Sequence, residues 1–198
     1  MTGISYDPQT ALIVVDVQND FAAADGSLYV RGGEQVVPVI NAEIEGARAA
    51  GATVVYTADW HPGTTPHFAK DGGIWPVHCV GGRWGSEFHP DLVVDGPVVR
   101  KGVNGEDGYS GFTTRDPVSE EIVPTELPEL LADQGISKLV VAGLATDYCV
   151  RSTVLDALAR GLPVSLLTDA IRSVDLEEGD GDRAIAEVEA AGCVLVSS

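Results

Sequence analysis

Short apolar runs alternate with amphipathic helical patterns along most of the chain. The apolar runs cover residues 11–17, 53–59, 97–102, 138–144, 163–169 and 193–198. They are apolar almost throughout instead of alternating with polar residues, which is typical of strands buried on both faces of a parallel sheet. Between them lie helical patterns over 36–51, 128–135, 147–161 and 183–192. The pattern predicts an α/β fold, a doubly wound sheet of about six mostly parallel strands with helices on both faces.

Length and composition favour one domain. The chain has 198 residues, 44% of them hydrophobic, which is enough for one large core. No internal repeat or linker interrupts it, so residues 1–198 are expected to form a single domain. The three cysteines are an odd number at wide spacing, which favours reduced thiols in a cytoplasmic protein over a disulfide framework.

The charge balance excludes some classes of partner. The formal net charge is −18, from 30 acidic and 12 basic residues, and such a field repels nucleic acid and anionic membrane surfaces. No apolar run approaches the roughly 20 residues needed to span a bilayer. The first ten residues have no cationic segment followed by an apolar one, so no targeting signal is expected.

Chemistry-bearing residues follow the predicted strands at the points where the strands end. Asp16, Asp59, Lys101 and Asp169 end four of them, and a short turn leading to Cys149 follows another. Because ligands of open parallel sheets bind beyond the carboxyl ends of the strands, we expect these side chains to share one edge. A polar residue also commonly ends a strand simply because the chain reaches water there, so each residue alone is weak support.

Cys149 lies in the first turn of a predicted helix, where it could be core filler, a metal ligand or a nucleophile. The positive end of the helix dipole there favours a thiolate, and free backbone N–H groups could hold an oxyanion. Thr146 or Asp147 could serve as a helix cap. Cys193 opens a strand and is expected to be a buried core residue, whereas Cys79 stays ambiguous.

A cysteine nucleophile needs a base, yet all four histidines lie in one segment in the middle of the chain. Asp16 is the alternative base, and Lys101 could orient that carboxylate and favour the thiolate. Cys149, Asp16 and Lys101 would then form a triad without histidine. The structural alternative for Asp16 is a hydrogen-bonded turn with Gln18 and Asn19.

The histidine-rich segment predicts a metal site. Asp59 and His61 are two residues apart, so in an extended chain they point the same way, and His67 and His78 follow. One carboxylate and three imidazoles suit one divalent ion of Zn, Fe or Mn. The alternative is a set of loop histidines bonded to backbone and water. No HExxH helix is present, so a metalloprotease is not indicated.

These stretches, taken in order, resemble the nicotinamidase/pyrazinamidase family of the isochorismatase-like cysteine hydrolases. The resemblance rests on "ALIVVDVQNDF", "DWHPGTTPHF", "WPVHCV", "FHPDL", "RKG", "DGYSGF" and "GLATDYCVRST". It implies hydrolysis of nicotinamide, and also of pyrazinamide, through a cysteine thioester, with a metal positioning the ring nitrogen and the product entering NAD salvage. The partner is then a small molecule, and both a monomer and a homo-oligomer remain open.

The resemblance also assigns residues. It implies a triad of Asp16, Lys101 and Cys149, metal ligands Asp59, His61, His67 and His78, and a pyridine ring held between Phe21 and Trp75. It places the oxyanion on the backbone N–H groups of Ala145 and Cys149, next to a cis peptide between Leu144 and Ala145.

Two other functions compete with this one. Related amidohydrolases acting on N-carbamoylsarcosine or ureidoacrylate share the triad but generally lack the histidine cluster, and isochorismatase itself lacks the thiol. A catalytically silent acidic scaffold on the same fold is the alternative from a different class.

Overall fold

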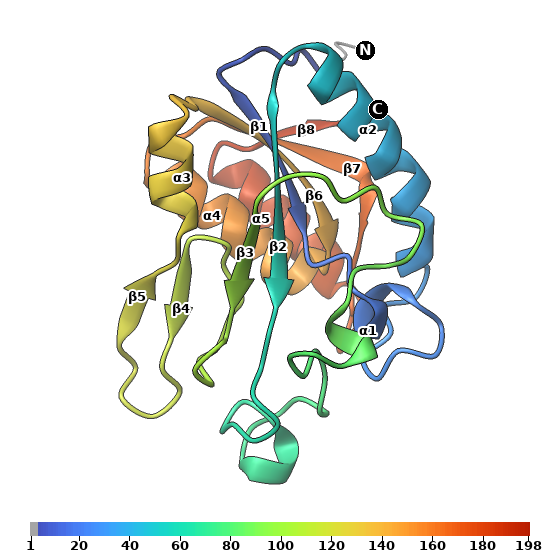
Figure 1. The fold of residues 1–198 in the computed structure, drawn as a ribbon, viewed down its shortest axis with the longest axis vertical. Helices are drawn as coiled ribbons and strands as arrows, with labels where there is room; N and C mark the ends of the chain where they lie inside the picture. Colours follow the sequence, from blue (N-terminus) through green and yellow to red (C-terminus); the bar gives the residue numbers. More distant parts are fainter. Residues whose placement is uncertain (1–3) are drawn as a thin grey trace.

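The chain folds around a parallel sheet, described over residues 4–198 in a computed structural model; the first three residues of the predicted domain lie outside this range. The sheet contains β1 (Thr10–Val15), β2 (Thr53–Asp59), β3 (Val98–Lys101), β6 (Lys138–Leu144), β7 (Val164–Arg172) and β8 (Val194–Val196). These six strands lie in the order β3-β2-β1-β6-β7-β8, and all neighbours are parallel (Figure 1). The predicted fold class is confirmed.

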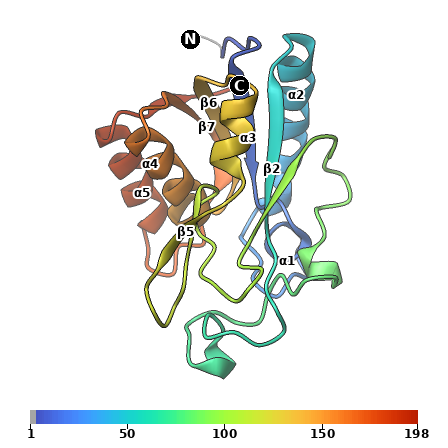
Figure 2. The ribbon, with the colours of Figure 1, turned by 60° about the vertical axis from the view of Figure 1, so that its left-hand side comes forward.

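Helices cover both faces of this sheet. They are α1 (Asn19–Ala22), α2 (Val36–Ala49), α3 (Leu127–Asp133), α4 (Arg151–Ala159) and α5 (Asp180–Ala190). Figure 2 shows α2 on one side of the sheet and α4 and α5 on the other. Within the described part of the chain, no helix combines the length and the apolar character needed to cross a membrane.

Each face of the sheet has its own core, and the central strand β1 feeds both. Leu12 and Val14 pack in the cluster that includes α2, whereas Ala11, Ile13 and Val15 pack in the cluster on the opposite face. All five are fully buried. Successive side chains of a strand point to opposite faces, so a strand with two buried faces must be apolar at every position.

Three features differ from the pattern-based expectation. A small antiparallel hairpin, β4 (Thr113–Arg115) and β5 (Ile122–Pro124), was not predicted because its strands are three residues long and largely exposed. The last long strand, β7, continues to Arg172, beyond the predicted end at residue 169. The helix after β6 opens with a π-helical turn, Thr146–Val150, before α4 begins.

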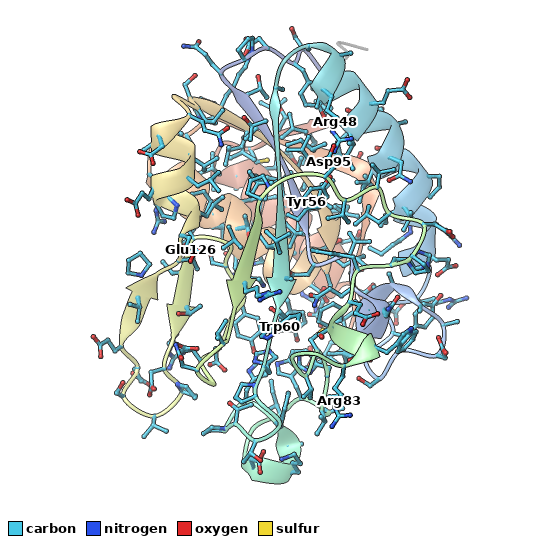
Figure 3. All side chains as sticks on the ribbon, in the orientation of Figure 1. Arg48, Tyr56, Trp60, Arg83, Asp95 and Glu126 are labelled. Carbon is cyan, nitrogen blue, oxygen red and sulfur yellow. The ribbon has the colours of Figure 1, made fainter. Side chains whose placement is uncertain are left out.

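The carboxyl ends of β1, β2, β3 and β6 point to the lower end of the molecule in Figure 1. Trp60 marks this end, immediately after β2 (Figure 3). Arg48 and Asp95 lie toward the opposite end, where the Arg48 Nη2 donates to the Asp95 carbonyl at 2.7 Å and ties α2 to the segment before β3. Asp16, Asp59, Lys101 and the turn that carries Cys149 therefore gather at one edge of the sheet, as the strand-end rule predicts.

Candidate active site

Cys149 lies in the π-helical turn that follows β6, at the carboxyl edge of the sheet. The amides on either side of it, those of Tyr148 and Val150, both donate to the Ala145 carbonyl at 3.1 Å. The cysteine is buried, with 6% of its surface exposed. The peptide between Leu144 and Ala145 is cis, as the family resemblance implies.

Asp16 and Lys101 meet beside this thiol. Asp16 accepts hydrogen bonds from Thr57 Oγ1 at 2.6 Å and from Lys101 Nζ at 2.7 Å. The Lys101 ammonium also donates to the Gly108 carbonyl and lies 3.6 Å from the Cys149 sulfur. A carboxylate oxygen of Asp16 lies within 4.8 Å of that sulfur. The structure thus brings together the three residues of the predicted triad.

Burial sets the protonation states of this cluster. It raises the pKa of Asp16 to about 6, although Lys101 opposes the shift. It also raises the pKa of the Cys149 thiol well above its ordinary value, again against the effect of Lys101. Desolvation of a buried anion thus acts against the thiolate that the helix start was expected to favour. The raised pKa of the thiol favours the protonated form of Cys149, so the sulfur needs a neighbouring base such as Asp16.

Gln18, three residues beyond the end of β1, holds the backbone of Asp59 by hydrogen bonds. The Gln18 side-chain amide accepts from the Asp59 N–H at 2.8 Å and donates to the carbonyls of Asp59 at 2.8 Å and Ser86 at 2.9 Å. Lys101 Nζ lies 2.8 Å from Asp59 Oδ1 as an ion pair and not as a hydrogen bond. Sequence reasoning missed this role of Gln18, whose only signal is a polar residue directly after a buried strand.

Three histidines and Asp59 converge at the neighbouring strand end. Asp59 Oδ2 lies 3.7 Å from His61 Nε2 and 3.8 Å from His78 Nε2. His61, His67 and His78 each offer a ring nitrogen within 4.8 Å of the other two. The Nδ1 of His78 lies 2.8 Å from the Pro76 carbonyl, so Nε2 is its nitrogen free for an ion. The three predicted imidazole ligands come together, and Asp59 lies beside two of them, His61 and His78.

The donor set fits a metal ion. Among the described residues, neither ring nitrogen of His61 has a hydrogen-bond partner, although the residue is 1% exposed. A buried ring nitrogen without a partner costs free energy unless an ion or another group binds it. The alternative of loop histidines bonded to backbone and water does not explain the unpartnered nitrogens of His61. Burial lowers the pKa of His61. Burial acts to raise the pKa of Asp59, but Lys101 and the two adjacent imidazoles hold it well below its ordinary value. Neutral imidazoles and a carboxylate suit Zn, Fe or Mn.

A small pocket opens between the thiol and the histidines. Phe21, Trp75 and Tyr148 line it together with Leu28, Tyr109 and Val174, and sequence reasoning did not assign these last three to the site. The Trp75 indole N–H donates to the Tyr109 hydroxyl at 2.7 Å, and the Trp75 ring meets Tyr148 edge to face at 4.8 Å. These three residues come from separate segments and carry no chemical signal of their own, so only the fold brings them together.

Two predicted edge residues have other roles. Asp169 does not join the site, because β7 continues past it, and its carboxylate accepts from the Ser198 N–H at 3.1 Å and hydroxyl at 2.6 Å. Asp147 does not cap its own helix. Its carboxylate accepts the N–H groups of Val174 at 3.0 Å and Asp175 at 2.9 Å, which ties the nucleophile turn to the segment after β7.

The remaining cysteines and tryptophans lie outside the pocket. Cys193 is buried in the core beneath α5, as expected. Cys79 is also fully buried, and its backbone N–H donates to Asp20 at 2.7 Å. Trp60 stacks with the Arg100 guanidinium 4.0 Å above its ring, and Trp84 is 47% exposed.

Comparison with known proteins covers nearly the whole chain. The model of the isochorismatase domain matches residues 10–198. A nicotinamidase from Escherichia coli (strain K12) is 38% identical, and the match spans 95% of this chain and 94% of that protein. The crystal structure of pyrazinamidase of Pyrococcus horikoshii in complex with zinc aligns with a TM-score of 0.86 at 38% identity, covering 96% of this chain and 100% of that one. The structure of PnC1 from L. infantum in complex with nicotinate aligns with a TM-score of 0.89 at 36% identity, covering 98% and 96%.

Proposed function

The chain belongs to the isochorismatase domain family, and on this premise we propose that it hydrolyses nicotinamide, and also pyrazinamide, to the free acid and ammonia. The resemblance inferred from the sequence motifs is confirmed by the nicotinamidase relative. The observation that carries the proposal is that Cys149 lines a pocket bordered by Phe21 and Trp75, with the buried Asp16 and Lys101 beside its sulfur. The proposed setting is NAD salvage in the cytoplasm.

Hydrolysis of the amide requires proton transfers between Asp16, Cys149 and the substrate. Asp16 accepts the proton of Cys149 as the sulfur attacks the carboxamide carbon, and the amides of Ala145 and Cys149 hold the oxyanion. Asp16 returns the proton to the departing nitrogen, so ammonia leaves and a thioester remains. Asp16 then takes a proton from water as the water oxygen attacks the thioester carbon. It gives this proton to the departing sulfur, which restores the free thiol and releases nicotinate. Lys101 orients Asp16 and balances its charge.

Phe21 and Trp75 supply the flat apolar walls between which a pyridine ring would stack. Asp59, His61, His67 and His78 would hold one divalent ion at the side of this pocket. When bound, the metal would supply a coordination position that orients the ring nitrogen of the substrate. The proposed ion is Zn, Fe or Mn, since each of these metals accepts imidazole and carboxylate ligands.

Ammonia release from nicotinamide by the purified, metal-loaded protein tests the proposal. Cys149→Ala should lose turnover to background while keeping the wild-type thermal unfolding temperature. Cys193→Ala is the matched control, because it removes a buried thiol that does not line the pocket, and the variant should keep its turnover. An active Cys149→Ala protein would contradict the mechanism. Release of ammonia from N-carbamoylsarcosine or ureidoacrylate and not from nicotinamide, after loading with each metal, would contradict the substrate.

A further inference from the structure

Asp107 is a carboxylate outside both the triad and the proposed ligand set that nevertheless contacts the histidine cluster. Its Oδ1 lies 2.6 Å from His67 Nδ1. The His67 side chain is 4% exposed and that of Asp107 is 19% exposed, so the contact is largely shielded from water. Sequence reasoning did not assign Asp107, because it lies in a loop 40 residues beyond His67 in the chain.

The backbone holds Asp107 in place. Its N–H donates to the Arg115 carbonyl at 2.7 Å, and the Arg115 N–H donates back to the Asp107 carbonyl at 3.0 Å, which pairs the loop with the end of β4. The histidine is fixed from its own side as well, because its N–H donates to Thr65 Oγ1 at 3.2 Å. The Thr65 hydroxyl in turn donates to the Gly105 carbonyl at 2.6 Å, so the two loops are tied together at this point.

The contact selects one tautomer of His67. A carboxylate can only accept, so the Nδ1 of His67 must carry the proton. The lone pair that a metal needs is then on Nε2. The tautomer of His78 is fixed in the same way, by a contact between its Nδ1 and a neutral acceptor, the Pro76 carbonyl. A charged acceptor additionally increases the basicity of the imidazole and its strength as a metal ligand.

We propose that Asp107 is a positioning residue for the metal site, which makes His67 a ligand by fixing its ring and its tautomer. The hairpin formed by β4 and β5 thereby supports the metal centre from outside the sheet. The inference rests on the metal site of the proposed function but not on its substrate.

The test is metal affinity, measured on purified protein by competition with a chromophoric chelator for Zn²⁺ and Co²⁺, with no substrate present. Asp107→Ala should weaken binding by about 10- to 100-fold, the usual effect of removing such a supporting carboxylate. Asp107→Asn keeps an acceptor oxygen but no charge, so its metal affinity should lie between those of the wild type and Asp107→Ala. Glu106→Gln is the matched control, since the neighbouring Glu106 carboxylate accepts from the backbone and side-chain N–H groups of Asn104, both at 2.9 Å. The metal affinity of this variant should equal that of the wild type.

A second measurement separates positioning from a general structural effect. If Asp107 acts through His67, adding Asp107→Ala to His67→Ala should cost no further affinity, and both single variants should change the visible absorption of bound Co²⁺ alike. Wild-type affinity in Asp107→Ala, or an equal loss in both backgrounds, would overturn the proposal. Failure of the protein to release ammonia from nicotinamide would contradict the proposed substrate and leave these affinities unaffected.

Discussion

Lys101 Nζ lies 2.8 Å from Asp59 Oδ1, so one buried ammonium joins the proposed triad to the proposed metal site. The same nitrogen lies 2.7 Å from Asp16 Oδ2, and the side chains of Lys101 and Asp16 are fully buried. Desolvation alone would lower the pKa of Lys101, but the two carboxylates hold it well above its ordinary value. The Lys101 ammonium therefore compensates two buried carboxylates, and its removal should leave both of them without a balancing charge.

Replacing Lys101 with methionine should destabilise the fold as well as abolish turnover. Breaking a buried pair by removing one partner costs about 3–5 kcal/mol, because the remaining charge is left uncompensated. Urea unfolding of the metal-free protein measures this cost. Lys70→Met is the control: Lys70 pairs with Asp71 at 2.6 Å but is 43% exposed, so its loss should cost less than about 1 kcal/mol. Equal stability of the two variants would show that Lys101 is not the compensating charge.

The rate should fall on the acid side as Asp16 takes up a proton. Burial raises the pKa of this carboxyl from 3.8 to about 6, and only the ionised form can accept the thiol proton. Turnover should thus be intact well above pH 6 and fall about tenfold per pH unit below it. Bound metal must be measured at each pH, because protonation of the histidine ligands also lowers activity. A rate that stays constant down to pH 4.5 with metal retained would exclude Asp16 as the base.

The proposed triad and two of the proposed metal ligands, Asp59 and His61, were accessible from the sequence because each ends a buried strand or closely follows such an end. His67 and His78 were accessible because they share a histidine-rich segment with His61. Asp16, Asp59 and Lys101 end three strands that lie side by side in the sheet, and parallel strands bring such ends to one edge. Asp169 shows where this argument stops. Its apolar run looks complete at the same kind of carboxylate, but β7 continues as far as Arg172 and carries Asp169 away from the site.

The contacts that tune the site were not accessible, because they join segments distant in sequence. Asp107 meets His67 only after the hairpin pairs with its loop, and Tyr109 meets Trp75 across two irregular segments. The protonation state of Cys149 also depends on the depth of burial, which no local pattern reports. The sequence predicts which groups reach the edge of the sheet, whereas packing decides their charge and their partners.

The absence of a side chain at Gly102 leaves room for the His61 ring, and an added methyl group should fill that space. A Cβ at Gly102 would lie 2.5 Å from His61 Cε1 and 2.6 Å from Nδ1, so Gly102→Ala should displace the ring and weaken metal binding. The backbone φ there is +74°, which itself disfavours alanine. Gly135→Ala is the control, with φ +66° and nothing within 4 Å of the added carbon. Both variants should lose about 1–2 kcal/mol of stability from the backbone, but only Gly102→Ala should lose metal affinity. Equal affinities would contradict the role of Gly102.

Tyr109 should act on substrate binding through Trp75. Its hydroxyl accepts the indole N–H at 2.7 Å and so fixes one wall of the pocket. Tyr109→Phe removes the acceptor but keeps the ring, so the wall becomes mobile while the triad is untouched. We expect KM for nicotinamide to rise about 5- to 10-fold with kcat nearly unchanged, the signature of binding lost equally in ground and transition states. Tyr29→Phe is the matched control, because that hydroxyl donates to Glu34 at an exposed position, and its kinetics should equal those of the wild type. A fall in kcat at unchanged KM in Tyr109→Phe would instead place this hydroxyl in the chemical step.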